Sequence, residues 1–363
     1  MDQFKPQIKK ESWPHIKEWQ SIRWLCPSNI ALIKYWGKHG EQMPDNPSLS
    51  FSLSKSITRL NFQYRSRKGQ SRPLEFLFEN KPHAEFKKRV VRVVESLKEY
   101  FPFLDHYQIR LNTVNTFPHS SGIASSASGM GALTLALCEM EQQLLGTLPS
   151  EEDFFRKASF CARIASGSAS RSVYGGFVSW GKTKLIHNSS DFYAQPLPIT
   201  IHSKFQKLCD AVLIVSSEKK RISSTAGHHL MQDHVYHDAR IHQAQENVLK
   251  LLESMEIGDF NTFLSIVEHE ALSLHALMMA SKPGYLLMEP GTLQLIEKIR
   301  NIREQKRMEI CFTLDAGPNI HLIYPDEMRQ PVLELIKSDL TAFCENQRWI
   351  DDRIGDGPVH LQS

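Results

Sequence analysis

The sequence predicts a two-part α+β protein, with an α/β half before about residue 200 and an α+β half after it. Three observations support this fold class. The chain has 363 residues, of which 41% are hydrophobic, so its length suggests two domains and its apolar content suffices for a sizeable core. Up to about Pro196, short segments with the apolar–polar alternation of strands are interspersed with apolar segments of helical spacing. Beyond that residue, longer helical segments alternate with short buried strands.

In the first half, strands are predicted where apolar residues alternate with polar ones or run between turn residues, and helices where apolar residues recur at helical spacing. The segment 24–36 is expected to break at Pro27, and 48–53 alternates hydroxyl and apolar residues. A helix should begin after Ser150, next to the acidic residues 151 and 152. The segments 24–25 and 29–36 are apolar and flank Pro27. The expected strands are 48–53, 60–64, 74–78, 107–112 and 177–180, and the expected helices are 84–100, 132–145 and 151–164.

In the second half, the apolar run 211–215 predicts a buried strand. Hydroxyl residues at 223–225 are good N-caps, so one long helix is expected to run from there to residue 255. A Pro–Gly pair at 283–284 should separate the next two helices. The remaining expected helices are 259–280, 291–303 and 332–344, and the remaining expected strands are 310–314 and 321–324.

Composition excludes several classes of protein. The formal net charge is +3, from 43 basic and 40 acidic residues, which argues against a nucleic-acid binder. The longest apolar runs are far shorter than the roughly 18 residues of a membrane span, and no leader-like segment opens the chain. The six cysteines form no C-x-x-C motif, so we interpret them as small core residues in a reducing compartment. We therefore expect a soluble, cytoplasmic protein without nucleic-acid or membrane partners.

The segment 117–129 is dense in serine, alanine and glycine and leads into an apolar helix. Small residues let a backbone approach an anion closely, and the helix N-terminus offers free N–H groups. No lysine follows the glycine, so this is not the phosphate loop of a P-loop NTPase. The alternative is a helix that uses small residues only for tight packing.

Three further segments carry candidate functional residues. Lys34 lies in an apolar segment, where its ammonium needs an acidic partner or a bound anion. Ser166, Ser168 and Arg171 form a second small-residue loop, in which the arginine can hold a carboxylate or phosphate. Taken alone, this loop favours the simpler interpretation of a serine-rich turn with a solvated arginine. Asp315 ends a strand before a Gly–Pro turn and is either aimed at a cleft or caps that turn.

Two weaker signals follow residue 218. Basic residues at 219–221 precede hydroxyl residues at 223–225, which suits a second anionic group. Histidines then occur at irregular spacings without an H-E-x-x-H motif, so we interpret them as a solvated helix face rather than a metal site. These histidines are His228, His229, His234, His237 and His242.

Four segments, in this order, resemble mevalonate diphosphate decarboxylase of the GHMP kinase superfamily. The family's N-I-A-x-x-K-Y-W-G-K opening is matched at 29–38, and its small-residue nucleotide loop at 118–127, with Ile123 where leucine is usual. Its G-S-G-S-A-C-R-S loop is matched at 165–172, with Ala165 for glycine and Ser170 for cysteine. The D-A-G-P-N turn is present unchanged at 315–319. Looser likeness extends over nearly the whole chain beyond residue 24.

The resemblance implies a GHMP-kinase-like fold with the active site in the cleft between two domains. It implies an N-terminal nucleotide-binding domain at 25–200, completed by 350–363, and a ferredoxin-like C-terminal domain at 201–349. Residues 1–24 are then an N-terminal extension. The resemblance also implies a homodimer that uses ATP and Mg²⁺ to convert mevalonate 5-diphosphate to isopentenyl diphosphate, CO₂, ADP and phosphate, within isoprenoid biosynthesis.

The resemblance assigns roles to individual residues. Asp315 would orient or deprotonate the C3 hydroxyl of the substrate, Lys34 would pair with Asp315, and Arg171 would hold the substrate's carboxylate or diphosphate. Ser125 and Ser126 would contact the ATP phosphates, and one of them the metal. Further substrate contacts are expected from Tyr35, Lys38, Ser166, Ser168, Ser223 and Thr225, and further nucleotide contacts from Ser120, Ser121, Gly122, Ile123 and Ala124.

Two alternatives stay open at this point. The substitutions Ala165 and Ser170 affect the expected position of the substrate's tail, so a decarboxylase of mevalonate 5-monophosphate is one alternative. A non-catalytic nucleotide-binding regulator is the other. Retention of Asp315, Lys34 and Arg171 together favours the diphosphate decarboxylase.

Overall fold

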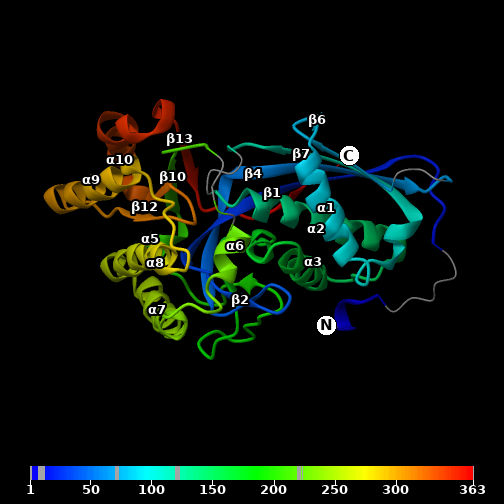
Figure 1. The fold of residues 1–363 in the computed structure, drawn as a ribbon, viewed down its shortest axis with the longest axis horizontal. Coiled ribbons are helices and arrows are strands. Elements are labelled where there is room, and N and C mark those ends of the chain that lie inside the picture. Colours follow the sequence, from blue (N-terminus) through cyan, green and yellow to red (C-terminus); the bar gives the residue numbers. More distant parts are fainter. Residues whose placement is uncertain are drawn as a thin grey trace.

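The computed structural model describes residues 2–6, 13–69, 73–118, 123–218, 222 and 224–362. Within these residues the chain forms an eight-stranded sheet, a four-stranded sheet and a two-stranded hairpin. The larger sheet and helices α1 to α3 occupy one side of the molecule, and the smaller sheet with α7 to α10 occupies the other (Figure 1). This is the two-domain α+β architecture that the sequence predicts.

Two long antiparallel strands form the centre of the larger sheet, β1 (Gln20–Ile33) and β4 (Ser48–Ser66). The sequence predicted a break at Pro27 in β1 and two shorter strands in place of β4, and both expectations were wrong. Register shifts next to Pro27 let the ladder continue past a residue without an N–H donor. The sheet order is β14-β1-β4-β7-β5-β6, with β8 paired to β4 and β9 paired to β8. The other strands are β5 (Leu74–Phe78), β6 (Lys81–Pro82), β7 (Tyr107–Asn115), β8 (Phe177–Trp180), β9 (Gln195–Pro196) and β14 (Val359–His360).

Helices cover one face of this sheet and bury its apolar side chains. The central one, α2 (Ser125–Leu145), is rich in small and apolar residues and ends at Gly146, whose positive φ of 64° suits glycine. The neighbouring α3 (Glu151–Ala165) starts at the predicted cap Ser150, whose side chain accepts a hydrogen bond from the Asp153 N–H. The remaining helices of this domain are α1 (Ala84–Ser96) and α4 (Ala169–Ser172), with a 3₁₀ turn at Pro102–His106.

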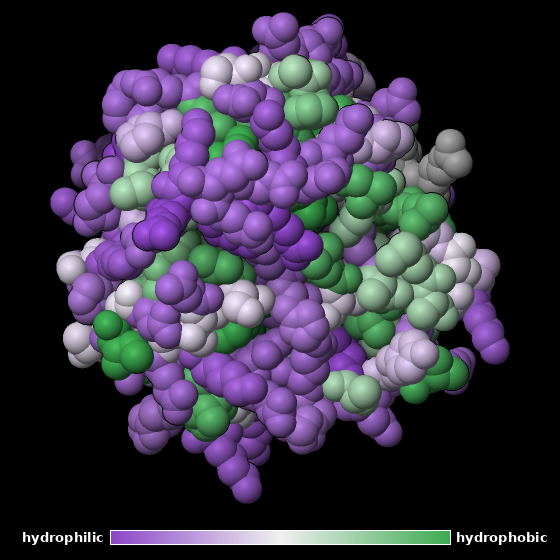
Figure 2. All heavy atoms as spheres, turned by 90° about the vertical axis from the view of Figure 1, so that its left-hand side faces the viewer, coloured by the Kyte–Doolittle hydropathy of each residue, from purple (hydrophilic) through white to green (hydrophobic). Residues whose placement is uncertain are grey.

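The smaller sheet is fully antiparallel in the order β11-β12-β10-β13. Its strands are β10 (Leu208–Leu213), β11 (Cys311–Thr313), β12 (Ile320–Pro325) and β13 (Trp349–Arg353). The helices of this domain are α5 (Ser203–Gln206), α6 (Ser224–His229), α7 (His237–Ile257), α8 (Phe260–Ala280), α9 (Pro290–Lys306) and α10 (Arg329–Leu335). Seen from this end, the surface is mainly hydrophilic, with hydrophobic side chains in several places (Figure 2).

Two helix predictions in this half were wrong. The single helix expected to reach residue 255 is divided into α6 and α7, because buried His234 turns the chain between them and contacts the Leu277 carbonyl. The helix expected at 332–344 ends as α10 at Leu335 and continues as a π turn (Ile336–Leu340) and 3₁₀ turns (Thr341–Phe343 and Glu345–Gln347). A further 3₁₀ turn precedes it at Asp326–Met328.

A buried carboxylate joins the two sheets. Asp352 of β13 accepts hydrogen bonds from the N–H groups of Ser54, Lys55 and Ser56 in the middle of β4. After this contact the chain returns to the larger sheet, where β14 pairs with Trp24 and Leu25 of β1. The segment 350–363 is therefore divided between both sheets.

The beginning of the chain packs against the first domain. A 3₁₀ turn (Asp2–Phe4) places Phe4 in the core, where its ring stacks on Phe160 at 4.3 Å between centroids. Trp13 packs against Phe103. All six cysteines are free and buried, as the sequence predicts. Within the described residues, no helix has the length and apolar character needed to cross a membrane.

Candidate active site

The sequence candidates Lys34 and Asp315 meet at the boundary between the two domains. Lys34 follows the end of β1 and Asp315 follows β11, and the Lys34 Nζ lies 2.9 Å from Asp315 Oδ1. The lysine side chain is 2% exposed and that of the aspartate 23%, so the carboxylate has access to a ligand. The Lys34 ammonium also donates to the Ala31 carbonyl at 2.7 Å. The ion pair that the sequence analysis expects is present.

The pair changes the protonation of both groups. Burial, the largest single influence, would raise the pKa of Asp315. However, attraction to the Lys34 ammonium and the hydrogen bond from it, together with the nearby His321 and Arg171, hold this pKa below its ordinary value. Burial lowers the pKa of Lys34, and Asp315 opposes that change. The site therefore presents an ionised carboxylate that can accept a hydrogen bond or a proton.

Arg171 lies buried in α4 behind the same carboxylate. Its Nε donates to Asn29 Oδ1 at 3.2 Å, and its Nη1 donates to Ser48 Oγ. Burial lowers the pKa of this guanidinium to about 10. Within the part of the chain that the structure describes, Arg171 has no acidic residue in ion-pair contact, and its Nη2 has no protein acceptor. A bound anion is the natural partner for such a group.

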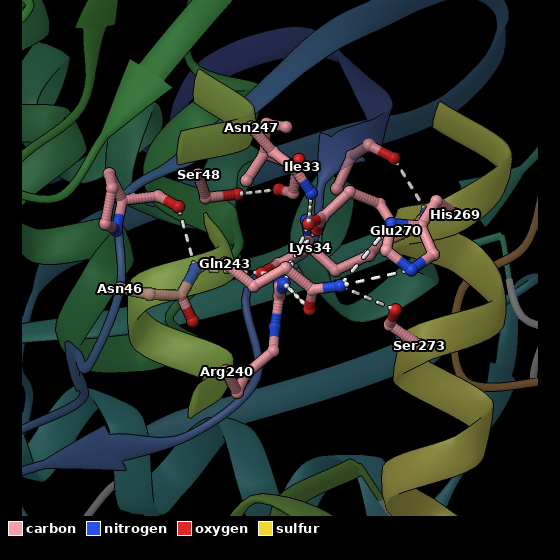
Figure 3. Close-up of polar contacts among 12 residues, drawn as sticks. Ile33, Lys34, Asn46, Ser48, Arg240, Gln243, Asn247, His269, Glu270 and Ser273 are labelled. Atoms are coloured by element: carbon pink, nitrogen blue, oxygen red, sulfur yellow. Dashed lines mark hydrogen bonds and ion pairs between the residues drawn. The ribbon is translucent and has the colours of Figure 1, made fainter. Parts of the chain in front are cut away.

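The backbone of Lys34 is held by Glu270 and Arg240 of the opposite domain and by Asn46 of its own domain. Its N–H donates to Glu270 Oε2 at 2.8 Å. Its carbonyl accepts from Arg240 Nη2 at 2.9 Å and from Asn46 Nδ2 at 3.0 Å. Figure 3 shows these contacts converging from α7, α8 and the loop after β3 (Met43–Pro44). None of these three residues was singled out from the sequence, although a glutamate in the apolar helix 259–280 signals a buried partner.

The serines of the two small-residue loops lie side by side. Ser126, in the first turn of α2, and Ser166, at the end of α3, have their hydroxyl oxygens 2.8 Å apart. The Ile123 side chain is buried, and its carbonyl accepts from Ser28 Oγ at 2.6 Å, which ties the loop to β1. Ala124 precedes α2 with a left-handed φ of 43°. The expected nucleotide contacts and substrate contacts therefore adjoin each other.

Some expected contacts lie outside what the structure describes. Ser120, Ser121 and Gly122 of the nucleotide loop are outside the described residues, as is Ser223. Thr225 lies in α6, but its side chain is likewise not described. Ser168 is the N-cap residue of α4, and its carbonyl accepts from Asn29 Nδ2 at 3.2 Å.

Tyr35 and Lys38 border the Lys34 pair. The Tyr35 hydroxyl is buried among the described residues without a hydrogen-bond partner, and it would approach a Cβ on Gly167 to 2.7 Å. Lys38 belongs to the short strand β2 (Lys38–His39) and donates to Gln42 Oε1 at 2.9 Å. Burial, and then the nearby positive charge of Arg89, lower the pKa of Lys38. Both side chains can take a further, anionic partner.

Two residues near the site were not predicted from the sequence. His228 was expected on a solvated face, but it is 7% exposed and packs against the rings of Tyr35 and Trp36 at 4.3 and 4.6 Å. Its Nδ1 accepts from the Gly37 N–H at 3.1 Å, and burial lowers its pKa to about 3, so the ring is neutral. The solvated-face expectation was also wrong for the buried His234.

The second unpredicted residue is Arg89, on the exposed face of α1. Its Nη2 donates to Ser126 Oγ at 3.2 Å. It also lines a pocket between α1, α2 and the sheet, together with apolar residues, Ser125 and Ser126. The apolar lining of this pocket consists mainly of Leu60, Phe76, Phe78, Phe86, Val90, Leu111, Met130 and Leu133. A basic side chain on the polar face of a helix gives no sequence signal for such a position.

The donor set for a metal consists of hydroxyls. Within the described residues, no group of three or more His, Cys, Asp or Glu side chains is arranged to hold a metal ion. Ser125 and Ser126 offer hard oxygen atoms that suit Mg²⁺ when phosphate oxygens supply the other ligands. The residues present therefore fit a magnesium ion that is bound together with a nucleotide.

Comparison with known protein families identifies both halves of the chain. A family model described as a diphosphomevalonate decarboxylase-like N-terminal domain matches residues 26–193. A second, described as a mevalonate 5-diphosphate decarboxylase C-terminal domain, matches residues 211–356. The diphosphomevalonate decarboxylase of Schizosaccharomyces pombe is 29% identical over 356 residues, which cover 93% of this chain and 86% of that protein. That of Candida albicans is 29% identical over 328 residues, 86% of each chain.

Solved structures agree with this result. The mevalonate diphosphate decarboxylase of Staphylococcus aureus superposes with a TM-score of 0.80 at 25% identity, over 95% of this chain and 99% of that one. MDDEF in complex with MVAPP, AMPPCP and magnesium gives a TM-score of 0.79 at 25% identity, over 95% and 100% of the two chains. With both domains matched and their order preserved, the chain belongs to the diphosphomevalonate decarboxylase family.

Proposed function

We propose that this chain is an ATP-dependent decarboxylase of mevalonate 5-diphosphate that produces isopentenyl diphosphate, CO₂, ADP and phosphate in the mevalonate pathway of isoprenoid biosynthesis. The observation that carries this proposal is the ion pair between Lys34 and Asp315, at 2.9 Å, with Arg171 beside it. An ionised carboxylate backed by two cations, one of them without an acidic partner, suits a substrate that carries both a hydroxyl and a carboxylate.

The reaction needs a base and a held carboxylate. The tertiary C3 hydroxyl of the substrate is a poor leaving group, so its oxygen first attacks the γ-phosphorus of ATP, and ADP departs. Asp315 accepts the proton of this hydroxyl. The carboxylate then leaves as CO₂, the electron pair of the broken C–C bond forms the double bond, and the C3–O bond breaks to release phosphate. Each bond that breaks is matched by one that forms or by a leaving group.

Lys34 and Arg171 have different roles in this proposal. Lys34 keeps Asp315 ionised. Because the Lys34 side chain is buried, its ammonium is directed to Asp315 rather than to solvent. Arg171 uses Nε and Nη1 for the protein, at Asn29 and Ser48, and its Nη2 remains for the substrate. This arrangement fixes the direction of the remaining N–H groups, which a lysine ammonium does not achieve.

The substrate's tail requires further donors. We assign it to Lys38, Ser166 and Ser168, all of which belong to the first domain. Tyr35 contributes its hydroxyl, and residues 223 and 225 remain proposed outer contacts. The lowered pKa of Lys38 supports this assignment, since a bound diphosphate would stabilise its charged form.

We assign ATP to the N-terminus of α2 and to the apolar pocket beside it. The adenine would enter the pocket between α1 and α2, and the phosphates would lie over residues 120–126 and Arg89. Ser126 already bonds Arg89, whereas the Ser125 hydroxyl has no hydrogen-bond partner among the described residues. We therefore assign the magnesium ion to Ser125, where the ion neutralises charge on the phosphates.

The experiment compares three substrates at saturating Mg-ATP: mevalonate, its 5-monophosphate and its 5-diphosphate, with ADP and CO₂ followed separately. Each charge-assisted hydrogen bond is worth about 1.5–3 kcal/mol, so loss of two should lower kcat/KM about 10²–10⁴-fold. We expect the diphosphate to be preferred over the monophosphate by at least about 100-fold. Equal efficiencies would favour the monophosphate decarboxylase, ADP without CO₂ a kinase, and no ADP with any substrate the non-catalytic regulator.

We also propose, on the family resemblance alone, that the chain forms a homodimer. Sedimentation equilibrium of the purified chain tests it directly, with a mass twice the 41.6 kDa of one chain as the expected result. A concentration-independent mass of one chain would contradict it.

A further inference from the structure

Helix α8 contacts the backbone of both members of the Lys34–Asp315 pair. Glu270 of α8 accepts from the Lys34 N–H at 2.8 Å, and His275 of the same helix lies with its Nε2 3.1 Å from the Asp315 carbonyl oxygen. Lys34 belongs to the first domain and Asp315 to the second. One rigid element therefore spans the distance between the two groups whose side chains form the reactive ion pair.

The contact with Lys34 is stronger than a single hydrogen bond. The Glu270 carboxylate and the Arg240 guanidinium form a two-armed pair at 2.6 and 2.7 Å, and Asn247 donates to the carboxylate at 2.7 Å. Arg240 also reaches the Lys34 carbonyl at 2.9 Å. The Lys34 backbone is thus held at its N–H by the Glu270 carboxylate and at its carbonyl by the Arg240 guanidinium, as Figure 3 shows.

Such a pair is a costly way to join two domains. The side chains of Arg240 and Glu270 are 2% and 0% exposed, so both charges are removed from water. Well-packed apolar residues often stabilise a protein as much as a buried ion pair does, or more. What the pair supplies is direction, because a planar guanidinium and a carboxylate fix the angle of every hydrogen bond they make.

The position of the Glu270 and Arg240 contacts matters because β1 ends at Ile33, one residue before Lys34. The last ladder partners are Ile33 and Leu49, so the peptide of Lys34 has no strand partner in this register. Without Glu270 and Arg240, the Lys34 backbone beyond the strand end would keep, among the residues that the structure describes, only the hydrogen bond from Asn46 Nδ2 to its carbonyl, and its N–H would have no partner there. A displacement of about 1 Å at a reacting group can lower a rate about 10²-fold.

We propose that α8 is a positioning element of this enzyme: Glu270, together with Arg240, fixes the Lys34 peptide, while His275 fixes the Asp315 carbonyl, so that ammonium and carboxylate meet in reactive geometry. The inference rests on the roles proposed above for Lys34 and Asp315. Glu270, Arg240 and His275 are positioning residues, since they touch the backbone of the reacting residues rather than the substrate.

The test compares Glu270→Gln with Glu268→Gln. Glu268 lies two residues earlier in α8, is 5% exposed in its side chain, and pairs with Arg300 and Arg303. It also accepts a long hydrogen bond, 3.4 Å, from the Phe312 N–H of β11, but it contacts neither Lys34 nor Asp315. Both variants remove one buried carboxylate charge, so both should lower Tm. We expect Glu270→Gln to lower kcat for CO₂ release at least about 10-fold and to leave KM for ATP within about 2-fold, whereas Glu268→Gln should keep kcat within about 2-fold.

Two further variants keep the test decisive if Glu270→Gln fails to fold. Arg240→Lys preserves the charge beside Glu270 but cannot bond both carboxylate oxygens and the Lys34 carbonyl, so kcat should fall with KM for ATP unchanged. At His275, glutamine should retain most of the rate because its amide can donate near the Nε2 position, and leucine should not. Wild-type kcat in Arg240→Lys and in His275→Leu would overturn the proposal.

The outcome for the wild-type enzyme separates the two hypotheses. If wild-type protein releases no CO₂ from any mevalonate species, the proposed function fails. If wild-type protein is active and the Glu270 and Glu268 variants lose the same fraction of kcat, the function stands and α8 has only a structural role.

Discussion

The two ends of the candidate site are built in different ways. The nucleotide end is local: Ser125 and Ser126 open one helix, and Arg89 reaches Ser126 from the neighbouring α1. The reaction end draws Lys34 and Asp315 from positions 281 residues apart and from different sheets. One end therefore depends on elements of the first domain alone, and the other on how two domains meet.

This difference has a consequence for function. A loop at a helix N-terminus can bind phosphate as long as its own backbone conformation is preserved, whatever the position of the second domain. The reaction end requires that the second domain present Asp315 to a lysine of the first, held there by α8. Substitutions at the reaction end should therefore reduce kcat and leave KM for ATP nearly unchanged. Substitutions at the nucleotide end should raise KM for ATP and leave kcat nearly unchanged.

The largest expected effect is that of Asp315→Asn. The amide cannot accept the hydroxyl proton, and a general base contributes about 10²–10⁴-fold, so kcat should fall by that factor while KM for ATP changes little. Release of CO₂ and ADP measures the rate, and circular dichroism checks the fold. A variant with a tenth of the wild-type rate would show that Asp315 is not the base.

Arg171→Lys should follow closely. A lysine cannot donate to Asn29 and Ser48 and still present a directed N–H to the substrate, so kcat/KM should fall about 10–100-fold, nearly as far as in Arg171→Ala. Steady-state kinetics of both variants give the comparison. Near-normal kinetics in the lysine variant would show that Arg171 contributes only its positive charge and no directed hydrogen bond.

The local end of the site was more accessible to sequence reasoning than the reaction end. Small residues and serines before an apolar run predict a helix with an anion site before it, because the signal lies within one segment. The helix was expected from residue 132, however, and α2 begins at Ser125. For Lys34, apolar neighbours indicate that an acidic partner or a bound anion must exist, but they do not say which of the two it is or which acid would supply it. Asp315 was chosen only through the family resemblance, since a contact over 281 residues leaves no local pattern.

The errors have the same origin. Pro27 breaks the expected alternation, yet β1 continues because the register shifts beside it and β4 supplies a long partner. His228 was placed on a solvated face because helical spacing gives no information about the rings of Tyr35 and Trp36 that cover it. Tertiary contacts decided both cases, and the domain boundaries near residue 200 stay a prediction.

At the nucleotide end we expect a smaller change. Arg89→Met keeps a long side chain over the pocket and removes the charge beside Ser126. One charge-assisted contact to a phosphate is worth about 1.5–3 kcal/mol, reduced by solvent at this exposed position, so KM for ATP should rise roughly 10-fold. The kcat at saturating ATP should remain within about 2-fold. A large loss of kcat with unchanged KM would mean that the two ends are not separable.

The smallest expected effect distinguishes a site built for a ligand from one built for stability. The Tyr35 hydroxyl is buried and has no partner among the described residues, so Tyr35→Phe should leave Tm unchanged or raise it slightly. If the hydroxyl donates to the substrate instead, the same variant should raise KM for mevalonate 5-diphosphate about 3–10-fold, because one neutral hydrogen bond contributes about 0.5–1.5 kcal/mol. Thermal unfolding with and without substrate, together with steady-state kinetics, measures both quantities. A lower Tm without a change in KM would assign the hydroxyl to the fold and remove Tyr35 from the substrate site.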